Sequence, residues 1–307
     1  MTAGSTVSGS LPELPATGVD YAQVLVKQVD FSGVGERLTG TLPSSWSSLS
    51  ALFQIALYVT QVSGTLPPSW GSLKQLMFLR LYHTQVSGTL PPEWSSMSAI
   101  SLIAMFGTKV SGTLPPEWSS STSMLELLLS NTSMSGSLPA TWNSMATLRT
   151  LHLENTSVSG TLPAVWSSMA RLQSLDVAGC RLYGSLPAEW SSLPRPVTLT
   201  LTNNSFCGCV PASWSATAGL TVVADASVTG STCTTTNSCS VTGACGLEGC
   251  IACATTSRPM CGACSDAYFL TEEGTCVEYC EDGAAAPSTV ALAALVVCVL
   301  VTALMGV

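Results

Sequence analysis

The residues with the most evident chemistry are cysteines toward the C-terminal end of the chain, nine of which lie between residues 233 and 280. Four of these follow the spacing Cys-x2-Cys-x7-Cys-x2-Cys from Cys250 to Cys264, which is typical of zinc sites. The same cysteines suit disulfides in a secreted protein, because oxidising compartments preserve such bonds. The features described below favour secretion, so the prediction is disulfides, with zinc kept as the alternative. The cysteines predicted to form disulfides, whose connectivity the spacing leaves open, are Cys207, Cys209, Cys233, Cys239, Cys245, Cys250, Cys253, Cys261, Cys264, Cys276 and Cys280.

Catalytic and nucleic-acid-binding functions are disfavoured by composition. The chain has only two histidines, His83 and His152, which lie 69 residues apart. The sequence contains no recognisable set of nucleophile, base and orienting residue, and no phosphate-binding glycine loop. With ten Lys and Arg and a net charge of −8, the chain lacks the basic surface that phosphate binding requires. We expect neither an enzyme nor a cofactor, and no nucleic-acid partner.

A strict internal repeat governs most of the chain. A glycine recurs every 24 residues, a proline follows it three residues later and a tryptophan six residues later. The glycines are Gly40, Gly64, Gly88, Gly112, Gly136, Gly160, Gly184 and Gly208, and the tryptophans are Trp46, Trp70, Trp94, Trp118, Trp142, Trp166, Trp190 and Trp214. Such self-similarity is the signature of a repeat architecture.

The segment between each tryptophan and the next glycine follows Leu-x-x-Leu-x-Leu-x-x-Thr-x-Val, the leucine-rich repeat pattern. It predicts a leucine-rich repeat solenoid, an α/β horseshoe with short parallel strands on the concave side and short 3₁₀ or helical turns, followed by a disulfide-rich C-terminal module. The Gly-x-Leu-Pro segment is predicted to be a turn and the tryptophans to fill the core. The threonines, such as Thr84, stand where an asparagine hydrogen-bond ladder is usual. Cys180 replaces one of them and is predicted to be a buried free thiol.

The pattern divides the chain into five parts. Residues 1–39 form an irregular first repeat or partial cap, in which Val26, Val29 and Phe31 are predicted to form a strand. Residues 40–232 form the array of 24-residue units, whose last members decay: Asp225 stands where a strand leucine belongs. Residues 233–280 form the Cys-rich module, residues 281–289 a small-residue spacer, and residues 290–307 a hydrophobic tail.

The C-terminal tail predicts a glycosylphosphatidylinositol (GPI) anchor signal. Small residues, a short polar spacer and a terminal apolar stretch make up such a signal, and Asp282 or Gly283 is the predicted attachment site. A transmembrane helix is the alternative, although no basic residue follows the tail. The start of the chain lacks the apolar stretch of a signal peptide, so we expect the sequence to be incomplete or mis-started there.

Outward-facing strand residues predict a binding surface on the concave sheet. In the first four full repeats they are largely apolar or aromatic, whereas the next three carry polar residues such as His152, Glu154 and Asp176. Exposed apolar patches mark interaction sites. The outward residues of the first four repeats are Phe53, Gln54, Ala56, Tyr58, Met77, Phe78, Arg80, Tyr82, Ser101, Leu102, Ala104, Phe106, Leu125, Glu126, Leu128 and Ser130. The predicted partner-binding residues among them are Phe53, Tyr58, Phe78, Arg80, Tyr82, Leu102 and Phe106; the alternative is that these side chains pack on one another or on a preceding segment.

Three glycosylation sequons, at Asn131, Asn155 and Asn203, occupy the same repeat position at the rim of the concave sheet. In the earlier repeats this position holds Val59, His83 and Gly107. Glycans would therefore cover the polar half and leave the aromatic half bare.

The Gly-Thr-Leu-Pro-Pro-Glu-Trp-Ser-Ser-Met unit, the Cys-rich block and the Ala/Val tail resemble the promastigote surface antigen family of Leishmania and related trypanosomatids. The resemblance covers residues 7–307. It implies a GPI-anchored or shed protein on the outer leaflet of the plasma membrane, with a role in host-cell attachment, and it implies a host complement receptor or complement component as the protein ligand.

Three functional hypotheses follow. The first is a cell-surface recognition protein that binds a protein ligand through the concave sheet. The second is a passive glycosylated coat without a specific ligand, for which a uniformly polar sheet face is expected. The third is an intracellular repeat adaptor with a zinc-binding Cys module.

Overall fold

The computed structural model describes residues 9–15, 19–20, 23–35, 37–215, 218–225 and 228, together with the backbone of five short strands between residues 232 and 278. The chain forms two compact units, 1–237 and 238–307. The predicted spacer, the anchor site at Asp282 or Gly283 and the tail at 290–307 lie outside the described residues. Among the described residues no helix has the length and apolarity needed to cross a membrane.

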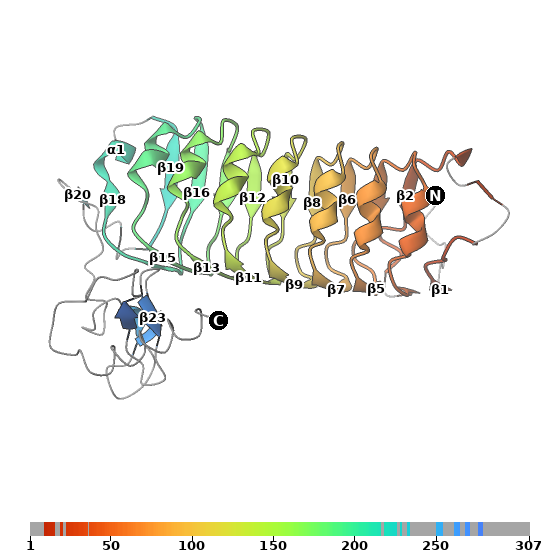
Figure 1. The fold of residues 1–307 in the computed structure, drawn as a ribbon, viewed down its shortest axis with the longest axis horizontal. Coiled ribbons are helices and arrows are strands. Elements are labelled where there is room, and N and C mark those ends of the chain that lie inside the picture. The colour runs from red at the N-terminus through yellow and green to blue at the C-terminus, as the bar shows by residue number, and fades with distance from the viewer. Residues whose placement is uncertain are drawn as a thin grey trace, which may run out of the picture. The chain divides into compact units, whose positions relative to one another are not determined.

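Each 24-residue repeat forms one coil of a solenoid, and one strand per coil joins a parallel main sheet of nine strands (Figure 1). The inward leucines of these strands, such as Leu79 and Leu81, are fully buried. The predicted stacking of Leu-x-Leu strands is thereby confirmed. The strands are β2 (Gln28–Asp30), β4 (Gln54–Ala56), β6 (Phe78–Arg80), β8 (Leu102–Ala104), β10 (Glu126–Leu128), β12 (Thr150–His152), β14 (Ser174–Asp176), β16 (Val197–Thr200) and β19 (Leu220–Val223).

A second parallel sheet of seven strands runs through the Val-Ser-Gly-Thr segments and includes the glycine of the Gly-x-Leu-Pro segment that was predicted to be a turn. For this glycine the prediction was wrong, because it continues the strand in a conformation that other residues rarely adopt. Gly88 has φ 83°, and a Cβ there would lie 2.9 Å from the Thr65 methyl carbon of the preceding coil. The strands are β5 (Ser63–Thr65), β7 (Gln85–Thr89), β9 (Lys109–Thr113), β11 (Ser133–Ser137), β13 (Ser157–Gly160), β15 (Arg181–Gly184) and β17 (Ser205–Phe206).

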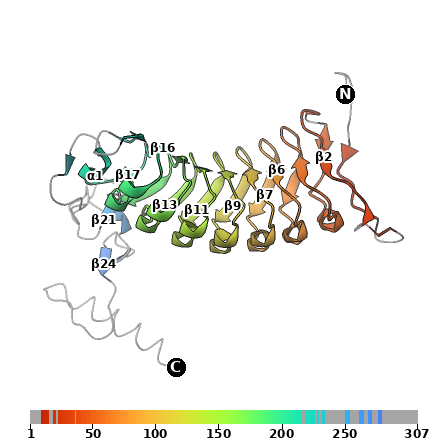
Figure 2. The same ribbon diagram turned by 90° about the horizontal axis from the view of Figure 1, so that it is seen from above.

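Short helices follow the prolines and lie along the side of the coils opposite the main sheet (Figure 2). Their tryptophans are all buried, so the prediction of a tryptophan core is confirmed. The helices are the 3₁₀ turns η2 (Ser44–Ser48), η3 (Pro68–Ser72), η4 (Pro92–Ser96), η5 (Pro116–Ser120), η6 (Ala140–Ser144), η7 (Ala164–Ser168) and η8 (Ala188–Ser192), and the α-helical turn α1 (Ala212–Ser215).

The tryptophans also connect the coils by hydrogen bonds. Trp70 donates its indole N–H to the carbonyl oxygen of Pro43 over 3.0 Å, and the six later tryptophans each bond in the same way to the proline 27 residues earlier. These prolines lie in the preceding coil, so one indole bond crosses every boundary between coils. Because the bonds are buried, breaking one would leave a carbonyl without a partner at a cost of about 1–3 kcal/mol.

The irregular first unit joins the array by strand pairing and by a tryptophan hydrogen bond, as the later coils do. Strand β1 (Gly9–Ser10) pairs with β3 (Leu38–Thr39), and β2 contains the predicted strand residue Val29. Trp46 donates to the carbonyl oxygen of Pro12, 34 residues earlier rather than 27. The seven additional residues therefore leave the indole bond in place, and the described residues of the first unit contribute a coil to the solenoid.

The last coil is shorter by one residue. Strand β19 pairs Val222 with Leu199, an offset of 23 residues instead of 24. Asp225 consequently falls one position beyond the expected strand leucine, so its predicted place was wrong. Its carboxylate oxygen accepts a hydrogen bond from the backbone N–H of Asn204 over 3.4 Å.

Cysteine-bearing strands follow the array. Cys207 and Cys209 each form a disulfide. Strand β18 (Val210–Pro211) pairs with β20 (Thr232–Cys233), whereas in the second unit β21 (Cys250–Cys253) pairs antiparallel with β22 (Cys261–Cys264), and β23 (Tyr268–Leu270) with β24 (Cys276–Glu278). The β21–β22 register sets Cys250 opposite Cys264 and Cys253 opposite Cys261. The predicted disulfides beyond Cys209 involve side chains outside the described part of the chain.

The threonine hydroxyls at the ladder position donate to backbone carbonyl oxygens of their own coil. The hydroxyl of Thr132, for example, donates to the carbonyl oxygen of Leu129 within the same coil over 2.6 Å. A threonine side chain is too short to reach the preceding coil. Asn204 does reach it, since its Nδ2 donates to the carbonyl oxygen of Val177, 27 residues earlier, over 2.8 Å.

Cys180 replaces a threonine at this ladder position, and its thiol makes a weaker contact with the preceding coil than the Asn204 amide does. It is a buried free cysteine, as predicted, and its Sγ lies 3.3 Å from the carbonyl oxygen of Leu153 in the preceding coil. Burial raises the pKa of this thiol, so it stays protonated and chemically quiet at neutral pH.

Replacing Cys180 by Asn should stabilise the protein by about 1 kcal/mol, because an amide donor replaces a weak thiol donor at the same carbonyl oxygen. The new Oδ1 can also accept from the N–H of Val158, as Oδ1 of Asn204 does from the N–H of Leu182 over 3.0 Å. Urea unfolding of Cys180→Asn and of the control Cys180→Ala measures the effect. The control should be less stable than the parent, and a Cys180→Asn variant less stable than the parent would contradict the ladder interpretation.

Candidate functional site

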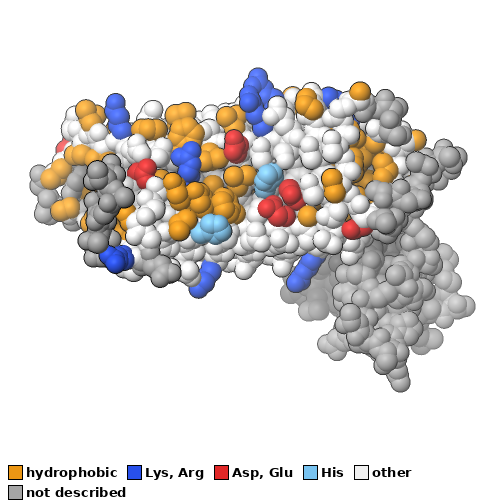
Figure 3. All heavy atoms as spheres, turned by 180° about the vertical axis from the view of Figure 1, so that it is seen from behind, with side chains coloured by type: hydrophobic (Ala, Val, Ile, Leu, Met, Phe, Trp, Pro, Cys, Tyr) orange, Lys and Arg blue, Asp and Glu red, His pale blue; other side chains and the backbone are white. Residues whose placement is uncertain are grey.

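The outer face of the main sheet has two chemically different halves. Hydrophobic side chains gather over the N-terminal strands, and acidic ones lie nearer the middle (Figure 3). Because the strands pair at intervals of 24 residues, equivalent residues of successive coils stand side by side in rows across the sheet. The site is therefore described row by row, and the structure brings together all seven residues that the sequence analysis selected.

The first row is a stack of aromatic rings from three adjacent coils. The Tyr58 and Tyr82 rings lie 4.5 Å apart at 11°, and the Tyr82 and Phe106 rings lie 4.5 Å apart at 8°. This separation is close to the spacing of strands in a sheet, roughly 4.8 Å, so the backbone itself sets the stack. Both faces of Tyr82 are covered by its neighbours, and the ring edges remain for a partner.

A second apolar group lies toward the start of the strands and spans two rows: Phe78 and Leu102 share one row with Gln54, and Phe53 stands at the repeat position of Met77. Phe53 and Phe78 meet edge to face with ring centroids 6.5 Å apart, and Leu102 stands beside Phe78 in the next strand. Met77, just before β6, is 40% exposed. The first row and this group are two ridges of half-buried apolar side chains.

Arg80 lies in the row between the ridges, with Ala56 on one side and Ala104 on the other. Its guanidinium carbon is 5.1 Å from the centre of the Phe78 ring, which is within the range of a cation–π interaction. The alanines were expected to be exposed, yet they are only 1% and 3% exposed, because such small side chains lie below the long ones around them. On either side of Arg80 this row is therefore lower than the rows of long side chains beside it, and we call it the Arg80 trough.

The guanidinium of Arg80 is not neutralised by the acidic residue whose charge it affects, Asp30. The nearby carboxylate of Asp30 accepts hydrogen bonds from Ser32 and Gln28. Its pKa is lowered, chiefly by the Ser32 hydroxyl bond and to a smaller extent by the charge of Arg80. Within the described residues the guanidinium of Arg80 has no hydrogen bond or ion pair. The pKa of Tyr82 is raised, mainly by desolvation, so its hydroxyl remains a neutral donor.

The other half of the face is polar. The Nε2 atom of His152 lies 3.0 Å from the hydroxyl oxygen of Ser174, and Asp176 accepts from the backbone N–H of Ala178 over 3.0 Å. The Oε2 atom of Glu154 is buried without a partner. No group of three metal-ligating side chains occurs in the part of the chain that the structure describes. His83 stands three coils away from His152, in contact with Tyr82 and Phe106.

The three sequon asparagines have a conformational role that the sequence analysis missed. Asn131, Asn155 and Asn203 have φ between 54° and 57°, in the left-handed region. The same repeat position holds Val59, His83, Gly107 and Gly179, and all of these residues are left-handed as well. Glycine and asparagine tolerate this conformation best, so their recurrence at one repeat position was the available signal. The asparagine side chains are exposed, and Nδ2 of Asn155 donates to Oδ1 of Asn131 over 3.2 Å.

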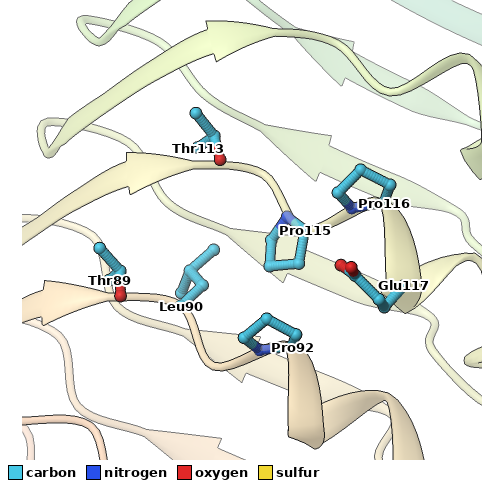
Figure 4. A pocket seen from close by; sticks show the side chains of 7 residues that line it. All are labelled: Thr89, Leu90, Pro92, Thr113, Pro115, Pro116 and Glu117. Carbon is cyan, nitrogen blue, oxygen red and sulfur yellow. The ribbon is translucent and has the colours of Figure 1, made fainter.

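The hollows on the opposite side of the array recur with the repeat and do not have the features of a small-molecule binding site. One of about 320 Å³ is lined by Thr89, Leu90, Pro92, Thr113, Pro115, Pro116 and Glu117, between the second sheet and the short helices (Figure 4). A second, of about 450 Å³, lies one coil earlier and uses the equivalent residues, such as Thr65, Pro68 and Glu93. A single carboxylate per hollow does not give the convergent polar groups of a small-molecule site.

Known proteins share this architecture. The Leucine Rich Repeat family model matches residues 171–193. A surface membrane glycoprotein, GP46/M-2 of Leishmania amazonensis, is 47% identical over 55 residues, which are 18% of this chain and 11% of that protein. These matches support a leucine-rich repeat protein.

Solved structures give the same fold over more of the chain. The plant peptide hormone receptor RGFR1 in complex with RGF2 superposes with a TM-score of 0.65 at 22% identity over 72% of this chain. The ectodomain of GASSHO1/SCHENGEN3 from Arabidopsis thaliana, in complex with CASPARIAN STRIP INTEGRITY FACTOR 2, gives 0.59 at 30% identity over 64%, and PEPR1–AtPEP1 gives 0.64 at 25% over 70%. The chain spans only 35%, 23% and 29% of these three receptor chains, respectively.

The left-handed position offers a test that is independent of any ligand. Val59 has φ 57° and is 48% exposed, so a β-branched residue is strained there while burying little surface. Replacing Val59 by Asn should raise the free energy of unfolding by about 1 kcal/mol. Val165→Asn is the matched control, since Val165 is 49% exposed but is not left-handed. Thermal and urea unfolding of both variants measure the effect; equal stability of Val59→Asn and the parent would show that the position carries no strain.

Proposed function

We propose that this protein is a cell-surface recognition protein that binds a protein ligand on the outer face of its main sheet. The observation that carries the proposal is the pair of apolar ridges flanking Arg80. Folding requires apolar residues on the inner face of the sheet, not on the outer one. Aromatic residues, Met and Arg gathered on an outer face are the composition of a protein interface.

The similar receptors support this use of the fold. The GASSHO1/SCHENGEN3 structure is the leucine-rich repeat ectodomain of a plant membrane receptor kinase in complex with CASPARIAN STRIP INTEGRITY FACTOR 2. Repeat folds of this kind typically act as non-catalytic ligand-binding scaffolds. We therefore assign this chain a binding role and no catalytic one.

A location at the cell surface is supported by separate observations. The matched Leishmania protein is a surface membrane glycoprotein, Cys207 and Cys209 are disulfide-bonded, and the three sequon asparagines are exposed. We propose glycosylation at Asn131, Asn155 and Asn203 and a GPI anchor at Asp282 or Gly283. By its resemblance to the promastigote surface antigens, a host complement receptor or complement component is the partner we propose to test first.

The polar half of the face favours a second candidate, a glycosylated coat that shields the membrane. Its exposed asparagines and charged side chains would suit that role. A shield alone, however, gives no reason for the aromatic stack, so we place recognition first. The two roles are compatible in one molecule, since they use different coils.

Replacing Phe78 and Tyr82 together by Ser should abolish ligand binding and leave the fold intact, because both side chains lie on the outer face. The double variant Thr198→Ser, Thr202→Ser is the matched control, since these residues occupy the same two rows five coils later. Surface plasmon resonance against the complement receptor ectodomain and purified complement components measures binding. We expect binding to the parent and the control and none to the aromatic variant; equal binding to all three would refute the site.

The anchor is tested on intact cells of the source organism. Phosphatidylinositol-specific phospholipase C should release a protein that lacks the residues beyond about Gly283. The same treatment of cells expressing the chain with a polyleucine transmembrane helix in place of residues 290–307 should release nothing. Retention of the native chain at the surface would favour the transmembrane alternative, and finding it inside the cell would contradict the proposed location.

A further inference from the structure

We propose that the Arg80 trough receives a carboxylate side chain, Asp or Glu, carried by an extended peptide segment with apolar residues beside it. The inference rests on the proposed function and adds the chemical class of the ligand. It follows from three features of the described residues: a partly exposed charge without a partner, short side chains on both sides of that charge, and apolar ridges along both edges of its row.

The charge is uncommitted because its neighbours are otherwise engaged. Asp30, the acidic residue whose pKa responds to Arg80, directs both carboxylate oxygens to Ser32 and Gln28. The guanidinium of Arg80 has no hydrogen bond or ion pair within the described residues, and it lies 5.1 Å from the centre of the Phe78 ring. A guanidinium has five donors in a planar fork, and a carboxylate is the side-chain group that accepts two of them in parallel.

The row is low on both sides of Arg80 because the flanking residues are alanines. Ala56 and Ala104 lie beside Arg80 in the adjacent strands and are almost completely buried. Larger residues at these positions would stand beside the guanidinium and limit access to it. In the neighbouring rows the same coils carry Gln54, Phe78 and Leu102 on one side and Tyr58, Tyr82 and Phe106 on the other, so the low row is confined to that of Arg80.

The two apolar ridges beside the trough indicate which residues accompany the acidic one in the peptide. The stack of Tyr58, Tyr82 and Phe106 forms one ridge, and Phe53, Phe78 and Leu102 form the other. From β4 to β8 the trough crosses two strand spacings, roughly 10 Å, which an extended peptide covers with about three residues. A short segment with one acidic residue among apolar ones therefore matches the trough in both charge and length.

Selection from a displayed library of random short peptides tests the inference. The full chain is the bait, in parallel with Arg80→Gln, with the Phe78→Ser, Tyr82→Ser double variant, and with Arg149→Gln as a control for charge on the polar half of the same face. We expect peptides selected on the parent and on Arg149→Gln to contain Asp or Glu next to Phe, Leu or Trp. This acidic preference should be absent from the Arg80→Gln selection.

The best peptide is then synthesised with Asp, Asn or phosphoserine at the acidic position, and its affinity is measured by fluorescence anisotropy. The Asp form should bind the parent roughly tenfold or more tightly than the Asn form, and the difference should vanish on Arg80→Gln. Arg80→Lys should recover only part of it, because an ammonium lacks the planar fork.

The outcomes separate this inference from the proposed function. Peptides that need Phe78 and Tyr82 but show no acidic preference would overturn the carboxylate site and leave the recognition surface standing. Tighter binding of phosphoserine than of Asp would overturn the carboxylate assignment in favour of a phosphate. Identical peptides on the parent and on the Phe78→Ser, Tyr82→Ser variant would overturn both proposals.

Discussion

One hydrogen bond, repeated at every boundary between coils, holds this structure in register: the indole N–H of a tryptophan donates to the carbonyl oxygen of a proline in the preceding coil. The bond is buried or partly buried, its length is 3.0–3.1 Å at each of these boundaries, and it persists where seven extra residues intervene between Pro12 and Trp46. Tryptophan also fills the core behind the second sheet, where rings of adjacent coils stack at 6.1–6.5 Å. One side chain thus supplies both the packing and the register.

A fixed register has a direct consequence for the outer face of the main sheet. Residues 24 positions apart stand side by side, so three aromatic residues at one repeat position become a continuous ridge. Tyr58, Tyr82 and Phe106 stack at the spacing of the strands because the backbones below them are held at that spacing. The same register places Arg80 between Ala56 and Ala104 and so forms the Arg80 trough. The proposed recognition surface therefore follows from the residues that the sequence places at equivalent positions of successive repeats.

Much of this could be predicted from the sequence because the period is strict and each strand has a clear inward face. The main sheet, the tryptophan core, the free thiol of Cys180 and the grouping of the aromatic residues all follow from counting in steps of 24. The second sheet was missed because its strands pass through a glycine with positive φ, which in sequence looks like a turn. The left-handed role of Asn131, Asn155 and Asn203 was missed because the sequon offers a different reason for asparagine. The indole bonds and the buried Ala56 and Ala104 depend on distances between coils, which the order of residues does not contain.

The most direct test of the central role of the tryptophan ladder is hydrogen exchange of the indole protons, followed by NMR on protein labelled with ¹⁵N-tryptophan. If the bonds hold the coils in register, the indole protons of the interior coils, from Trp70 to Trp190, will exchange only when the array unfolds. They will then have the same protection as the backbone amides of the main sheet. Trp46 and Trp214, in the end coils, will exchange first. Exchange of the interior indole protons within seconds, while the sheet amides stay protected, would show that the coils are held together by other means.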